Sequence, residues 1–146
     1  MVKPSRTHIV ILGSGSPIAN PERSGPALAI IVDDATYIVD SGPGIVRRAA
    51  EAAIKYQLEP LKPNNLSTAF LTHLHHDHTA GLPDLMLTPW TNDRLEPLIV
   101  IGPPGTKKLA DGITQAFSED LRIRLNGMEP ANETGWETRA KDVLPG

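Results

Sequence analysis

The sequence predicts a layered α/β domain in which a mixed sheet is flanked by helices. Short runs rich in β-branched residues alternate with longer segments in which apolar residues recur every three or four positions. Such an alternation of strands and amphipathic helices is typical of α/β domains. The 146 residues are enough for one domain with its own core, and no repeat, low-complexity tract or linker divides them.

Three strands are expected in the amino-terminal part of the chain. Residues 8–12 form an apolar run closed by Gly13-Ser14-Gly15-Ser16-Pro17, which predicts a strand entering a polar loop. Residues 27–32 and 36–39 are rich in β-branched side chains and flank an Asp-Asp-Ala turn. This pattern predicts a hairpin made by the second and third strands.

A helix is expected after the third strand. Asp40-Ser41-Gly42-Pro43 ends the strand, and proline is well tolerated in the first turn of a helix because its missing N–H is not needed there. Apolar residues then follow helical spacing, with charged residues on the other face. The side chains expected to face the core are Ile45, Val46, Ala49, Ala50, Ala53 and Ile54.

The remaining elements are a strand over residues 66–71, a strand over residues 98–101, and a helix from Thr106 to about Phe117. The polar tail over residues 126–146 shows no further element, so we expect the chain to stop without a closing strand or helix.

Composition excludes several classes of function. The chain has 14 basic and 17 acidic residues, a net charge of −3 and no block of like charge, so no DNA or acidic-lipid partner is indicated. It has no cysteine, so any metal must be held by imidazole and carboxylate groups. The apolar run at residues 9–12 is too short for a signal peptide or a membrane span. We therefore expect a soluble, cytoplasmic protein with no membrane partner.

Four of the five histidines lie within the six residues His73-Leu74-His75-His76-Asp77-His78. In an extended segment alternate side chains point the same way, so His73 and His75 can bind one metal ion. Asp77 and His78 fall on the following turn, where they can reach a second ion. His76 should point away from His75, so we expect it either to face solvent or to support the metal ligands without binding the metal.

Three other interpretations of the histidine cluster are a solvated loop, a fortuitous metal-binding tract and an expression tag. A tag would be terminal and made of one residue type. The cluster instead follows an expected buried strand, directly before Thr79-Ala80-Gly81-Leu82. This context favours a metal site in a loop at the carboxyl end of the strand.

The run Thr72-His73-Leu74-His75-His76-Asp77-His78 resembles the hallmark motif of the metallo-β-lactamase superfamily. Residues 12–17, 24–27, 39–42 and 101–107 resemble, in the same order, segments of the branch that contains ribonuclease Z and the arylsulfatase-like hydrolases. The resemblance runs from His8 to Pro130. It implies an αβ/βα sandwich of two similar halves, with two zinc ions, or other divalent metals, at the edge where the sheets meet.

The resemblance implies a role for each residue of the motif. His73 and His75 would bind the first metal ion, and Asp77 and His78 the second, with Asp77 also orienting the nucleophile. Asp40 matches the acidic residue that orients these ligands without binding the metal itself. The alternative for Asp40 is a helix cap before Pro43.

The chain departs from the family pattern after the motif. The pattern requires a third histidine for the first metal, a bridging aspartate and a distal histidine, but no histidine follows His78. None of the later aspartates has a matching context: Asp84, Asp93, Asp111, Asp120 and Asp142. We interpret residues 1–146 as a single partial domain, the amino-terminal half of the sandwich without its carboxyl-terminal half. Such a chain lacks that half or forms a homo-oligomer, because one apolar face of the sheet is left uncovered.

For the intact protein the resemblance implies a hydrolase that uses a hydroxide bound by two zinc ions. The first expected reaction is phosphodiester cleavage of RNA, of the ribonuclease Z type. The second is hydrolysis of a small-molecule ester, of the arylsulfatase type, because His76 stands where ribonuclease Z usually has glycine and no basic tRNA-binding arm is visible. The non-enzymatic alternative is a metal-binding or assembly module with an incomplete site.

Overall fold

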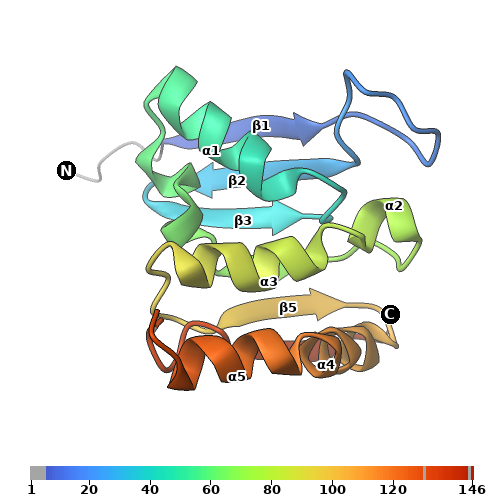
Figure 1. Ribbon diagram of the computed structural model, residues 1–146. Coiled ribbons are helices and arrows are strands. Elements are labelled where there is room, and N and C mark those ends of the chain that lie inside the picture. Colours follow the sequence, from blue (N-terminus) through green and yellow to red (C-terminus); the bar gives the residue numbers. More distant parts are fainter. Residues whose placement is uncertain (1–5, 130, 145) are drawn as a thin grey trace.

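The computed structural model describes residues 6–129, 131–144 and 146, and its centre is one sheet of six strands in chain order (Figure 1). The strands are β1 (Thr7–Gly13), β2 (Ala27–Val32), β3 (Ala35–Val39), β4 (Thr68–Phe70), β5 (Leu98–Gly102) and β6 (Thr138–Asp142). Strand β2 pairs antiparallel with both β1 and β3, whereas β3 to β6 run parallel. The sheet is therefore mixed, as the sequence predicts.

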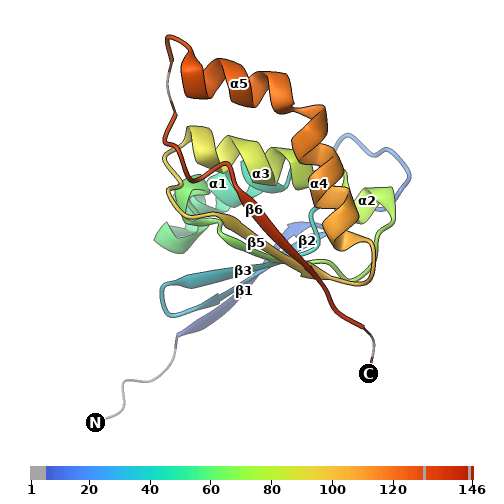
Figure 2. The ribbon, with the colours of Figure 1, turned by 90° about the horizontal axis from the view of Figure 1, so that it is seen from below.

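The longer helices lie together on one side of the sheet (Figure 2). The α-helices are α1 (Ile45–Tyr56), α2 (His76–Thr79), α3 (Leu82–Thr91), α4 (Thr106–Ala116) and α5 (Ser118–Asn126), and two short 3₁₀ turns cover Glu59–Leu61 and Pro63–Asn65. In the described part of the chain, no helix is long and apolar enough to cross a membrane.

The core lies between the sheet and these helices. Alternate strand residues such as Ile31, Ile38 and Val100 are fully buried and point toward the helices. The helices contribute the apolar stripe of α1 and the mostly apolar α3, whose Leu85 and Trp90 are almost completely buried. This packing fixes the strand ends from which the histidine-rich segment departs.

The other face of the sheet carries apolar side chains that no described residue covers. Ile9 is 68% exposed and Ile11 is 71% exposed, and their neighbours Val10 and Leu12 point to the opposite, helix-covered side. Exposed apolar residues continue across the same face on the other strands: Val32, Tyr37, Phe70 and Ile99. We call this surface the bare face, and it is the uncovered sheet face that the sequence predicts.

Helix α1 matches its prediction except at Ile54 and at Ala50, which is half-buried rather than buried. Ile45, Val46, Ala49 and Ala53 are buried as expected, but Ile54 is 82% exposed. At about 100° per residue, Ile54 lies roughly opposite the centre of the buried stripe. Burial of Ile54 was expected because the residue is hydrophobic, although its position on the helix points it away from the core.

Several elements differ from prediction. The expectation that the tail lacks a further element is wrong, because Thr138–Asp142 pairs in parallel with β5 as strand β6. The helices Leu82–Thr91 and Ser118–Asn126 were not predicted. The strand expected over residues 66–71 is confined to Thr68–Phe70, although Leu66 and Leu71 at its ends are buried.

Candidate metal centre

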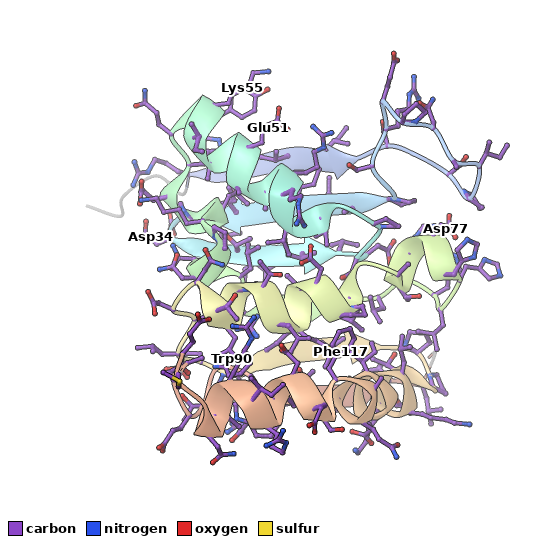
Figure 3. The ribbon with its side chains drawn as sticks, viewed as in Figure 1. Asp34, Glu51, Lys55, Asp77, Trp90 and Phe117 are labelled. Atoms are coloured by element: carbon purple, nitrogen blue, oxygen red, sulfur yellow. The ribbon has the colours of Figure 1, made fainter. Side chains whose placement is uncertain are left out.

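The candidate site lies where β3 and β4 end. These strands are parallel, with Ile38 opposite Ala69 and Val39 opposite Phe70, so their carboxyl ends meet at one edge of the sheet. The next residue after β3, Asp40, continues the pairing because its N–H donates to the Phe70 carbonyl over 2.8 Å. In Figure 3 the labelled Asp77 lies at this end of the sheet and Asp34 at the other.

Asp40 is the buried centre of the site. It is 7% exposed and adopts φ = 62°, a left-handed conformation that aspartate tolerates better than most residues. Its Oδ1 accepts the Thr72 backbone N–H at 2.8 Å, and its Oδ2 lies 2.8 Å from Nδ1 of His78. Asp40 does not cap α1, whose N-cap is Gly44 without a side-chain hydrogen bond.

The predicted metal ligands lie near one another, and one of them, His78, contacts this carboxylate. The ring centroids of His73 and His78 are 4.1 Å apart, and those of His73 and His75 are 4.7 Å apart. Nε2 of His78 lies 3.5 Å from Oδ2 of the buried Asp77. His76 is exposed, in keeping with its expected orientation away from the other rings.

The ligand turn, which we define as residues 75–81, is partly helical rather than entirely a loop. His75 is extended, with ψ = 146°, and α2 then forms a four-residue helix over His76–Thr79. The Thr79 hydroxyl donates to the His75 carbonyl at 3.0 Å and thereby ties the two ends of this helix together. The expectation of a loop holds for residues 73–75 and is wrong for the rest of the motif.

The ligand turn packs against the segment that carries Asp40 through two backbone hydrogen bonds. The N–H of Ser41 donates to the His78 carbonyl, and the N–H of Gly81 donates to the Ser41 carbonyl, both over 2.8 Å. The fit depends on glycine, because a Cβ on Gly81 would lie 2.2 Å from the Gly42 carbonyl oxygen. A Cβ on Gly42 would in turn lie 2.3 Å from the backbone of Gly25. Sequence reasoning did not assign these glycines a role, although Gly25 and Gly42 fall in two of the segments that carry the family resemblance.

The chemistry of these donors suits a divalent cation, but their number is small. Imidazole and carboxylate groups without a thiolate fit a borderline ion such as zinc. Asp77 is 6% exposed, so a cation beside its carboxylate would compensate a charge that is costly to bury. However, within residues 6–129, 131–144 and 146 no three His, Asp or Glu side chains are arranged to hold a metal ion together.

The sequence of residues 21–120 matches the model of the metallo-beta-lactamase superfamily. Ribonuclease Z of Mycobacterium marinum (strain ATCC BAA-535 / M) is 40% identical to this chain over 120 residues. Ribonuclease Z of Mycolicibacterium gilvum (strain PYR-GCK) is 38% identical over 120 residues. Both alignments cover 80% of this chain and 40% of the relative, so the chain spans about 40% of the length of the curated relatives it matches.

Solved structures agree on the fold. The human tRNase Z short form superimposes with a TM-score of 0.69 at 23% identity, over 97% of this chain and 46% of that chain. A long form RNase Z from yeast superimposes with a TM-score of 0.60 at 19% identity, over 81% of this chain and 17% of that chain. The predicted α/β fold is thus confirmed. Since the family match extends over most of its 146 residues, this chain belongs to the metallo-β-lactamase superfamily.

Proposed function

We propose that this chain is part of a metal-dependent phosphodiesterase that cleaves RNA, similar to ribonuclease Z. The observation that carries the proposal is the cluster at the ends of β3 and β4, where the buried Asp40 carboxylate lies beside the histidine-rich motif. The identity to ribonuclease Z over 80% of the chain supports the substrate class. An RNA substrate also fits the cytoplasmic location that we propose for the protein.

Superfamily membership implies a divalent metal ion, and we propose zinc because imidazole is the main donor. His73 and His75 would hold one ion, and Asp77 and His78 the other. When bound, the ions would supply positive charge that activates water and stabilises the phosphodiester oxygens in the transition state. We assign to the Asp77 carboxylate the orientation of the attacking water.

Asp40 would fix the direction of one ligand. Its carboxylate lies at Nδ1 of His78, so it accepts the proton of that nitrogen and leaves the Nε2 lone pair free. Nε2 of His78 faces Asp77, which supports the proposal that both side chains bind the same ion. The backbone bonds from Ser41 and Gly81 would keep the ligand turn at a constant distance from Asp40.

We also propose that residues 1–146 form a partial domain whose site is completed by further ligands. A catalytic zinc ion normally has three protein ligands, whereas the motif offers two for each ion. The bare face is of the kind that a second apolar sheet covers in a sandwich. In a longer protein the missing half would provide that sheet, and in this chain alone a second copy would do so.

A non-catalytic metal-binding or assembly module is the second candidate function. It is favoured by the lack of a three-ligand group among the described residues. An arylsulfatase-like ester hydrolase is an alternative enzyme class, favoured by His76, which stands where ribonuclease Z usually has glycine. The first of these would hydrolyse no substrate, and the second would hydrolyse a small-molecule ester in place of RNA.

The first experiment measures zinc binding by this chain with isothermal titration calorimetry. We expect weak binding that His75→Ala and Asp77→Asn each reduce by at least tenfold, since each removes a ligand. His8→Ala is the matched control, because His8 is an exposed histidine on β1 outside the cluster. Equal losses for His8→Ala and His75→Ala would contradict the assignment of the site.

The second experiment measures hydrolysis of an RNA precursor, a phosphodiester reporter and an aryl sulfate. The longest natural product of the gene should cleave the RNA and the diester, with kcat lowered at least a hundredfold by Asp77→Asn. The 146-residue chain alone should show no turnover at a comparable rate, because its ligand set is incomplete. Faster cleavage of the aryl sulfate, or no turnover by any form, would favour the second candidates.

A further inference from the structure

The hydroxyl of Thr72 lies between the Asp40 carboxylate and the ring of His73. Its Oγ1 is 2.8 Å from Oδ2 and 3.0 Å from Oδ1 of Asp40. The same Oγ1 is 3.0 Å from Nδ1 of His73. The backbone N–H of Thr72 also donates to Oδ1 of Asp40 at 2.8 Å, so two bonds hold this residue against the carboxylate.

The number of available protons fixes the direction of these hydrogen bonds. A threonine hydroxyl has one proton, and an ionised carboxylate only accepts. The Thr72 hydroxyl therefore donates to Asp40, and its oxygen is left to accept a proton from Nδ1 of His73. A neutral imidazole that donates from Nδ1 has its lone pair on Nε2.

We propose that Thr72 is a positioning residue that transmits the orienting effect of the Asp40 carboxylate to the ring of His73. Through this hydroxyl, one carboxylate fixes two imidazoles in the same tautomer, His78 directly and His73 indirectly. Both rings then present Nε2 as the nitrogen able to bind a metal ion. The consequence for metal binding rests on the proposed function, whereas the tautomer itself does not.

The surroundings of Thr72 argue against a role in core packing. Thr72 is an exposed residue and does not belong to the buried apolar cluster. By contrast, the hydroxyls of the buried Thr36 and Thr79 donate only to backbone carbonyls, those of Pro60 and His75. Thr72 differs because its hydroxyl contacts two ionisable side chains of the site.

The test compares Thr72→Val, Thr72→Ala and Thr72→Ser with a matched control. Valine keeps the shape of threonine and removes the hydroxyl, alanine removes it with less steric risk, and serine retains it. Thr36→Val is the control because Thr36 lies on the same strand, β3, that precedes Asp40, but at its other end. Circular dichroism establishes that each variant is folded.

The readout is the ring ¹⁵N chemical shifts of His73 in the metal-free chain, at a pH where the ring is neutral. We expect protonation at Nδ1 in the parent chain, in Thr72→Ser and in Thr36→Val, and its loss in Thr72→Val and Thr72→Ala. An unchanged His73 tautomer in both hydroxyl-free variants would overturn the relay. Equal loss in Thr72→Ser would do the same, because serine retains the donor and acceptor.

Zinc titration of the same variants separates this inference from the proposed function. Thr72→Val should weaken zinc binding by about tenfold or more, the usual effect of removing a group that orients a metal ligand. A lost tautomer with unchanged zinc affinity would overturn the positioning role. No zinc binding by the parent chain, together with the expected tautomers, would count against the proposed function and leave the relay established.

Discussion

The carboxylate of Asp40 and Nδ1 of His78 are 2.8 Å apart although 38 positions separate them in the sequence. The contact joins the end of β3 to the ligand turn, and three donors from Thr72 and His78 converge on the single carboxylate. Such a group is expected to orient its partners more strongly than it stabilises the fold. Its removal should therefore affect metal binding first.

Asp40→Asn should weaken zinc binding by about 10–100-fold, because an amide presents one acceptor oxygen in place of two. Asparagine tolerates the positive φ of this position, so the change tests the carboxylate rather than the backbone. Asp93→Asn is the control, since Asp93 also has a positive φ, of 69°, and is exposed. Calorimetric titration decides the prediction, and equal affinities for Asp40→Asn and the parent chain would refute it.

Gly42→Ala should destabilise the protein by about 1–3 kcal/mol, the usual cost of overpacking. The added Cβ would lie 2.3 Å from the Gly25 carbonyl carbon and 2.6 Å from the Pro26 nitrogen, and backbone atoms yield less readily than flexible side chains. Gly112→Ala in α4 is the matched control, because nothing lies within 4 Å of its added Cβ. It should stabilise the helix by about 0.5–1 kcal/mol.

Urea unfolding monitored by circular dichroism measures both glycine variants. Zinc affinity should fall only in Gly42→Ala, since Gly42 packs between Gly25 and the ligand turn. If Gly42→Ala is as stable as the parent chain, the close approach of these backbones is not required by the fold.

Sequence patterns predicted the elements whose apolar residues are regularly spaced and missed the elements without such spacing. The stripe of α1 follows from helical spacing, and β2 follows from its β-branched residues. Strand β6 has the sequence Thr-Arg-Ala-Lys-Asp, so its strand character comes from backbone pairing with β5 and not from its side chains. Helix α3 was missed because Pro83 and Pro89 suggest breaks and its apolar residues surround much of the helix.

The candidate site was predictable to the extent that its residues are chemically distinctive. A cluster of histidines is a specific signal, so the residues expected as ligands were all chosen from the motif. The expectation that Asp40 orients this site came only from the family resemblance, because nothing local connects distant segments, and its pairing with His78 was not predicted. Thr72 was not singled out, since a threonine has many roles and its meaning depends on the two side chains that it contacts.

Arg94→Met should lower the free energy of unfolding by about 1.5–3 kcal/mol, the range for losing hydrogen bonds from a buried charged donor. Arg94 is 1% exposed, and burial lowers the pKa of Arg94 to about 10, so its guanidinium is charged at neutral pH. It donates to four backbone carbonyls, those of Leu66, Leu85, Met86 and Gly135, over 2.7 to 3.0 Å. These contacts connect α3 with the segments before β4 and β6.

Methionine preserves much of the volume but removes the four hydrogen bonds that the guanidinium donates to those carbonyls. Arg122→Met is the control, because the exposed Arg122 pairs only with Glu119 on the same helix and should be almost neutral. Denaturant unfolding distinguishes the two variants. Similar midpoints for Arg94→Met and Arg122→Met would show that the buried network contributes little.

Ile11→Lys should shift this chain toward the monomer, because we expect copies of the chain to associate through the bare face. Ile11 is 71% exposed on β1, opposite Leu28 of β2, and it belongs to an apolar surface that continues across the sheet. Full burial of one isoleucine contributes about 1.5–3 kcal/mol, so replacing it by a charged residue should raise the dissociation constant at least tenfold.

Ile54→Lys is the matched control, since Ile54 is 82% exposed on α1, on the helix side of the sheet. Light scattering over a dilution series should show a dimer for the parent chain and for Ile54→Lys, and dissociation at higher concentration for Ile11→Lys. A parent chain that is monomeric at every concentration and unfolds cooperatively would mean that the bare face tolerates water without a partner.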